Sequence, residues 1–368
     1  MIPFVDVVQQ YTLYRKEFKK AFEDVCSSGM FILGPEVQRF EKRFCAYLGV
    51  KEAVGVASGT DALRLACQAL GIGPGDEVLV PANTFIATAL SVYDLGSIPV
   101  PVDVNPESFL MDLTDASSRL TGRTKAILPV HLYGRSMDMD AVTAFSRKHN
   151  LLLIEDACQA HGAMWEGRRV GSFGAVGCFS FYPGKNLGAF GDGGMIVTED
   201  HSVAEKLRLL RNYGSIKKYI HEFPGTNSRL DSLQAAILNV KIKFLDKWNK
   251  KRFCAARRYT EKLKNIKGLR LPVLDFDNIS RHVFHLFVLT CERRDELLDY
   301  LTKQDIGCGV HYPVPIHLHR AFISLGYKKG SCPVAEQLSE KIISLPMFPE
   351  ITDKQIDTVA GAVRRFYD

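Results

Sequence analysis

Short apolar runs, each bounded by glycine, proline or charged residues, recur through the first two hundred residues of the chain. Runs of this length with such boundaries are typical of buried β-strands. Segments of helix length lie between several of them, around residues 62–70, 84–95 and 138–150. This alternation predicts a doubly wound α/β domain with a mostly parallel sheet. The apolar runs are at 53–57, 77–81, 98–102, 125–130, 151–156, 176–181 and 195–198.

The two ends of the chain have a different pattern. Residues 8–48 carry apolar side chains at helical spacing, broken near Gly29 and Gly34, and predict an N-terminal arm of two helices. The last hundred residues alternate extended and helical patterns and predict a small α+β domain. A chain of 368 residues is too long to fold around a single hydrophobic core. We therefore expect an arm and large domain at 1–250 and a small domain at 251–368. The expected elements outside the large sheet are helices at 201–214, 231–263, 293–304 and 353–366 and extended segments at 283–290 and 310–315.

A lysine within a glycine-rich loop and an aspartate upstream of it are the candidate chemical groups. Lys185 lies between Gly184 and Gly188, which let other groups approach closely. Partial removal of a lysine from water lowers its pKa and makes the amine nucleophilic. Asp156 ends the run at 151–156, where an α/β sheet forms its ligand crevice. Such a pair indicates pyridoxal phosphate (PLP) chemistry. On residue types alone, a solvated lysine and a strand-end cap remain the alternative.

Further candidates lie at the starts of two predicted helices. Ser58-Gly59-Thr60-Asp61 opens the first helix after a strand, and free N–H groups with two hydroxyls there favour an anion such as phosphate. Helix capping is the alternative use of these residues. Phe85, after Asn83-Thr84, could stack on a flat ring, and core packing is its alternative.

Composition narrows the classes of function. A hydrophobic fraction of 46% and a charged fraction of 24% are those of a soluble globular protein. The net charge of +6 is spread along the chain and does not indicate nucleic-acid binding. No apolar run reaches about eighteen residues and no signal peptide is seen, so we expect a cytoplasmic protein without membrane segments. The nine scattered cysteines predict buried, reduced side chains.

Several motifs resemble sites of other kinds without matching them. The glycines at 171, 174 and 177 do not form a dinucleotide or Walker loop, which disfavours nicotinamide and ATP. The pairs His282/His285 and His317/His319 have no converging carboxylate or cysteine in the sequence, so no metal site is expected.

Four segments in order resemble the DegT/DnrJ/EryC1/StrS family of PLP-dependent nucleotide-sugar aminotransferases. The resemblance covers essentially the whole chain. It implies an aspartate-aminotransferase-like fold (fold type I) and a homodimer with shared active sites. Gly184 departs from the threonine that many members have, while the Lys185-Asn-Leu-Gly188 segment is intact. The four segments are Ser58–Asp61, Glu155–Ala160, Phe179–Gly194 and Gly225–Ala236.

The resemblance also implies roles for individual residues. Lys185 would be the Schiff-base lysine and Asp156 the partner of the pyridine nitrogen. Gln159 would lie beside the cofactor ring, with Phe85 stacked on it. The phosphate would be held by Gly59, Thr60, Ser180 and, from the neighbouring subunit, Asn227. Contacts to the sugar nucleotide would come from Arg229, His311 and Tyr312.

The resemblance implies transfer of an amino group from L-glutamate to a keto-sugar nucleotide. Members with histidine at the lysine position perform dehydration, whereas Lys185 favours transamination. The segment 310–318 resembles members that act on 3-keto sugars, so we expect a dTDP- or UDP-linked 3-keto hexose. A 4-keto substrate, another PLP enzyme acting on amino acids, and a non-catalytic sugar-nucleotide binder remain alternatives.

Overall fold

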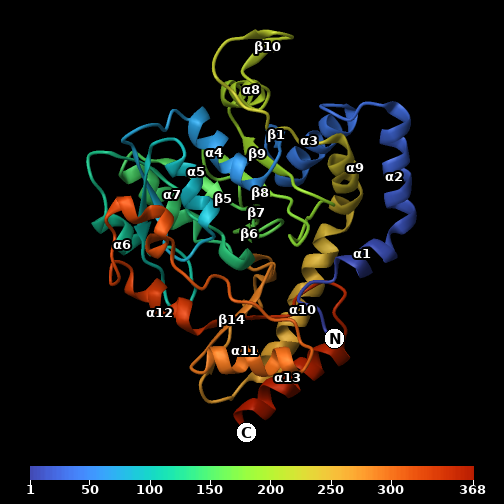
Figure 1. Cartoon of the computed structure of the whole chain (residues 1–368), viewed down its shortest axis with the longest axis vertical. Helices are drawn as coiled ribbons and strands as arrows, with labels where there is room; N and C mark the ends of the chain where they lie inside the picture. The colour runs from blue at the N-terminus through green and yellow to red at the C-terminus, as the bar shows by residue number, and fades with distance from the viewer.

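The computed structural model describes residues 1–368, and a seven-stranded sheet lies at its centre (Figure 1). The strand order is β1-β9-β8-β5-β4-β2-β3. The pairs β2/β3, β2/β4, β4/β5 and β5/β8 are parallel, whereas β9 runs antiparallel to both β1 and β8. The mostly parallel sheet predicted from the apolar runs is therefore present. Its strands are β1 (Glu52–Val56), β2 (Glu77–Pro81), β3 (Ile98–Val102), β4 (Thr124–Ile127), β5 (Leu152–Asp156), β8 (Val176–Ser180) and β9 (Gly194–Thr198).

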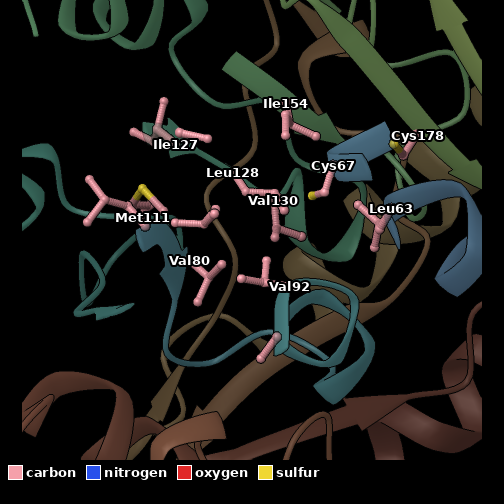
Figure 2. Close-up of a cluster of buried hydrophobic side chains, with 14 of the residues drawn as sticks. Leu63, Cys67, Val80, Val92, Met111, Ile127, Leu128, Val130, Ile154 and Cys178 are labelled. Carbon is pink, nitrogen blue, oxygen red and sulfur yellow. The ribbon is translucent and has the colours of Figure 1, made fainter. Parts of the chain in front are cut away.

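Helices cover the sheet and close its largest hydrophobic core. Figure 2 shows Leu63 and Cys67 from one helix and Val92 from another lying close to side chains of the sheet strands. These side chains are 0–1% exposed, so their burial is a main source of stability. The helices that follow the strands are α4 (Gly59–Ala69), α5 (Ile86–Tyr93), α6 (Leu113–Ser118), α7 (Met139–Lys148) and α8 (His201–Leu210).

The N-terminal arm has three helices rather than the two predicted, because the chain also breaks at Tyr14: α1 (Val7–Leu13), α2 (Arg15–Ser28) and α3 (Pro35–Leu48). Gly29 adopts a left-handed conformation (φ 67°) and ends α2, while Pro35 opens α3 at its first position, as such residues favour. Helices α2 and α3 both pack against α9 (Ser232–Lys241), beside which they lie in Figure 1. A short 3₁₀ turn, Ile242–Phe244, then joins α9 to α10 (Leu245–Leu263).

A second sheet and its helices form the C-terminal part, at the bottom of Figure 1. Strand β13 (Phe287–Cys291) lies antiparallel between β12 (Leu269–Arg270) and β14 (Ile342–Leu345). A core of its own joins this sheet to α10, α11 (Arg294–Lys303) and α13 (Asp353–Tyr367). The helix α12 (Pro333–Lys341) instead contributes to the core of the large sheet. The division at 250/251 falls within α10 and stays a prediction.

Several elements differ from those expected. The helix at 201–214 ends at Leu210, and the segment 310–315 forms no strand. Its two prolines lack the N–H group that a sheet ladder needs. Helix α12 and strand β14 were not predicted, because no glycine or proline separates them in the sequence. Cys26 and Cys254 are exposed rather than buried. None of the helices has both the length and the hydropathy needed to span a membrane.

Two small hairpins complete the structure. One pairs β6 (Met164–Trp165) with β7 (Arg168–Arg169). The other pairs β10 (Ser215–Lys217) with β11 (Ile220–His221) and projects from the molecule beyond α8 (Figure 1). Tyr219 at its tip is 83% exposed. This hairpin occupies the segment that leads to Asn227 and Arg229.

Candidate active site

A cavity of about 700 Å³ lies where the large sheet, the N-terminal arm and the C-terminal part meet. Nine of the eleven site residues predicted from the sequence line it. Asp156 and Ser180 are the last residues of β5 and β8, and Gly59 opens α4 after β1. The strand ends thus bring together groups that are far apart in sequence. The nine are Gly59, Thr60, Phe85, Asp156, Gln159, Ser180, Lys185, His311 and Tyr312.

Lys185 is held in the cavity by its neighbours in the chain. Its backbone N–H donates to the carbonyl of Tyr182 at 2.9 Å. The next residue, Asn186, donates from its amide to Asn249 Oδ1 at 2.9 Å and to the Val283 carbonyl at 3.0 Å. A turn with such anchors fixes the direction of the lysine. Burial lowers the pKa of Lys185, while Cys158 and Asp156 oppose that shift.

Asp156 is buried, at 4% exposure, with part of its hydrogen-bonding capacity in use. Its Oδ2 accepts from the Thr88 hydroxyl at 2.9 Å, and its Oδ1 accepts from the Cys158 backbone N–H at 3.1 Å. A carboxylate accepts up to about four hydrogen bonds. Asp156 therefore retains capacity for a donor that enters the cavity.

The start of α4 forms one wall of the cavity. Ser58 caps the helix, since its hydroxyl accepts from the Asp61 N–H at 3.1 Å. A Cβ at Gly59 would lie 2.5 Å from Ser180 Cβ, so only glycine lets the helix start approach Ser180. The first N–H groups of a helix have no partners within it. Together with the hydroxyls of Thr60 and Ser180, they form a cradle suited to phosphate.

Polar and aromatic groups form another wall of the cavity. Gln159 donates from its Nε2 to the Tyr312 hydroxyl at 3.2 Å. Phe85 is 50% exposed, so the core-packing alternative is wrong, and its ring centre lies 5.3 Å from that of Tyr312. His311 Nδ1 forms a hydrogen bond with Ser344 Oγ at 2.9 Å. Burial and the charge of Lys185 lower the pKa of His311 to about 4, so its imidazole is neutral.

The cavity is also lined by residues that no motif in the sequence identifies as part of a site. Thr88 comes from α5, His285 precedes β13, and Phe4 precedes α1. Their side chains reach the cavity through tertiary packing alone. Burial holds the pKa of His285 well below its ordinary value.

Asn227 and Arg229 do not line this cavity. Asn227 is exposed and forms a β-bridge with Asn212, whose side-chain oxygen accepts from Arg229 Nη1 at 3.0 Å. The resemblance assigns Asn227 to the site of a neighbouring subunit, so its place outside this cavity leaves that prediction untested.

Comparison with known proteins places these features in a family. Residues 13–364 match the model of the DegT/DnrJ/EryC1/StrS aminotransferase family. The chain belongs to that family. The recognition from the four motifs is thereby confirmed.

Relatives and a solved structure cover the chain almost completely. It is 47% identical to dTDP-3-amino-3,4,6-trideoxy-alpha-D-glucose transaminase of Streptomyces venezuelae over 99% of this chain and 96% of that protein. It is 45% identical to UDP-N-acetyl-3-dehydro-alpha-D-glucosamine 3-aminotransferase of Acidithiobacillus ferrooxidans, over 99% and 97%. The crystal structure of ntda from Bacillus subtilis with bound cofactor PMP has a TM-score of 0.88 and 32% identity, over 95% and 81%. The predicted aminotransferase fold is confirmed.

This family of aminotransferases depends on PLP, and the cavity fits that cofactor. A half-buried lysine, a buried carboxylate with spare capacity and a helix start with a glycine cradle suit its aldehyde, ring nitrogen and phosphate. The chain is a PLP-dependent transaminase, and the predictions of enzyme class and cofactor are confirmed.

Proposed function

We propose that this enzyme moves an amino group from L-glutamate to C3 of a dTDP- or UDP-linked 3-keto hexose. A transaminase of keto-sugar nucleotides is supported by the names of the two relatives described above, each of which is a 3-amino-sugar enzyme. The single observation that carries the proposal is the joint presence of Lys185 and Asp156 in one cavity of about 700 Å³. The wall with Gln159, His311 and Tyr312 offers neutral hydrogen-bonding groups, which suit sugar hydroxyls.

The residues divide the work between binding and proton transfer. Lys185 would link to the cofactor, and Asp156 would pair with the ring nitrogen, with Gln159 and Phe85 beside the ring. Once bound, the cofactor supplies the electron sink for breaking the C–H bond of the amino donor. Lys185, freed when the donor binds, carries the proton at that carbon. Because burial lowers its pKa, more of its amine is unprotonated near neutral pH and can accept that proton.

The experiment is the visible absorption spectrum of the cofactor-loaded protein before and after addition of L-glutamate. The wild-type band should disappear with glutamate, and a 3-keto sugar nucleotide should restore it. Lys185→Ala should show no response. A protein that never acquires the band would contradict the enzyme and favour the non-catalytic binder.

A panel of acceptors separates the substrate alternatives. Matched 3-keto and 4-keto hexoses, each linked to dTDP and to UDP, should be ranked by how fast they restore the band. Preference for a 4-keto compound would overturn C3 amination. Restoration by keto acids alone would favour an amino-acid transaminase.

We also propose that two copies share their active sites, with Asn227 of each copy joining the phosphate and Arg229 the nucleotide in the other. The projecting hairpin, with exposed Ile216, Tyr219 and Ile220, supports an inter-subunit role. Mixing Lys185→Ala with Arg229→Ala should give more activity than either variant alone, because mixed dimers contain one complete site. Absence of such complementation, or a monomeric mass in sedimentation, would contradict sharing.

A further inference from the structure

Tyr133 lies behind the wall of the cavity and takes no part in the roles assigned above. It is the middle residue of a 3₁₀ turn, Leu132–Gly134, and is 3% exposed. Its φ of 59° is in the left-handed region, which is unfavourable for a bulky side chain. Backbone strain of this kind persists where surrounding contacts hold it, and it is concentrated at functional sites.

Two hydrogen bonds of Tyr133 lead to residues of the cavity wall. Its backbone N–H donates to Gln159 Oε1 at 2.7 Å, and its hydroxyl donates to the carbonyl of His311. Gln159 in turn donates to the Tyr312 hydroxyl at 3.2 Å. Because Tyr312 follows His311 in the chain, these bonds form a closed ring. The ring joins the end of β5 to a segment of the C-terminal part.

The same turn also holds the segment that carries His285. The Tyr133 carbonyl accepts from the Leu286 N–H at 3.3 Å, and the Gly134 carbonyl accepts from the Val283 N–H at 2.9 Å. Gly134 has φ 93°, and a Cβ there would lie 2.9 Å from the Val283 side chain. One strained turn thus contacts the segments that carry Gln159, His311 and His285.

We propose that Tyr133 is a positioning residue that sets His311 and Tyr312 against Gln159 for recognition of the sugar nucleotide. This inference rests on the proposed function, because it assigns the wall to the sugar substrate. Tyr133 contacts no reacting group and acts through the direction it gives to its neighbours. The hydroxyl is the group through which the Tyr133 side chain itself contributes, since the backbone hydrogen bonds persist whatever side chain is present.

Tyr133→Phe removes only the hydroxyl and leaves the His311 carbonyl without its donor. Two other contacts, the Ser344 bond and the Phe4 ring at 5.3 Å, still hold His311 and should preserve the fold. Tyr259→Phe is the matched control, because Tyr259 is fully buried and its hydroxyl has no hydrogen-bond partner. Both variants lose one buried phenolic hydroxyl, but only one of them breaks the ring of bonds.

The experiment measures binding of the amino-sugar nucleotide product by calorimetry and KM and kcat for the keto-sugar nucleotide. Tyr133→Phe should weaken product binding and raise the sugar KM about tenfold, the loss expected for one buried hydrogen bond, with kcat within about twofold. The glutamate-driven loss of the visible band should keep its wild-type rate. Tyr259→Phe should match wild type in every one of these measurements.

The outcomes separate this inference from the proposed function. Wild-type protein that turns over no keto-sugar nucleotide contradicts the proposed function. Active wild-type protein with unchanged sugar binding in Tyr133→Phe overturns the positioning role alone. Equal losses in the glutamate and sugar half-reactions, together with a lowered melting temperature, also overturn it, because they indicate a purely structural residue.

Discussion

Two buried carboxylates at the end of β5 face different regions of the molecule. They differ in how many hydrogen-bond donors surround each carboxylate. Glu155 faces the interior behind the cavity, and four donors surround it: the N–H groups of Gly171, Phe173 and Gly174 at 2.6–2.8 Å and His131 Nε2 at 3.1 Å. Asp156, the next residue, faces the cavity with only two donors. Saturation marks a structural carboxylate, whereas spare capacity marks one available to a ligand.

The largest expected effect comes from Asp156→Asn. An amide cannot carry the charge that keeps the cofactor ring protonated, so turnover should fall on the order of 10²- to 10³-fold. The amide can still accept the Cys158 N–H, so folding and cofactor content should stay near wild type. Steady-state rates alongside the absorption spectrum test this. Near-normal activity would refute the role of Asp156 and remove the functional difference between Asp156 and Glu155.

Glu155→Gln should have the opposite profile. Its amide nitrogen would face backbone N–H groups that now meet a carboxylate oxygen, so unfolding free energy should fall by about 2–4 kcal/mol. Activity per folded molecule should change little, because Glu155 does not line the cavity. Urea denaturation of both carboxylate variants provides the measurement. Loss of activity without loss of stability would show that saturation does not separate the two roles.

Acid should destabilise the folded protein in part through a buried histidine, His161. His161 is 1% exposed between Phe179 and Phe181, and burial lowers its pKa from 6.5 to about 3. The unfolded chain therefore binds a proton below about pH 6.5 that the folded chain rejects. The contribution of His161 to stability is full above that pH and falls by about 1.4 kcal/mol per pH unit as pH drops toward 3.

His161→Leu removes this titration, so its unfolding free energy should fall about 2 kcal/mol less than that of wild type between pH 6.5 and pH 5. Urea denaturation of the cofactor-free protein at several pH values checks the slope. Identical slopes for the two proteins would show that His161 is solvated or protonated in the folded state.

The sequence predicts the sheet and the chemical pair better than it predicts their surroundings. Lys185 and Asp156 lie in continuous motifs with their own glycines and strand boundaries, so local patterns suffice to find them. Nothing local distinguishes Glu155 from Asp156, because the donors to Glu155 come from a loop some sixteen to nineteen residues later. Tyr133 and Thr88 have no motif, and only tertiary packing brings them to the site. The functional roles of the predicted residues stay predictions.

The smallest expected effect tests the link between Asp156 and the helix beneath it. Thr88 is 1% exposed, and its hydroxyl donates to Asp156 at 2.9 Å and lies 2.9 Å from the Thr84 hydroxyl. Thr88→Val keeps the shape of the side chain and removes this donor, so Asp156 should be held less firmly and turnover should fall about tenfold. Thr143→Val on α7 is the matched control, since that buried hydroxyl has no partner and its removal should leave turnover unchanged. Equal rates in the two variants would mean that the Cys158 N–H alone orients Asp156. The hydrogen bond from Thr88 to Asp156 would then be dispensable for turnover.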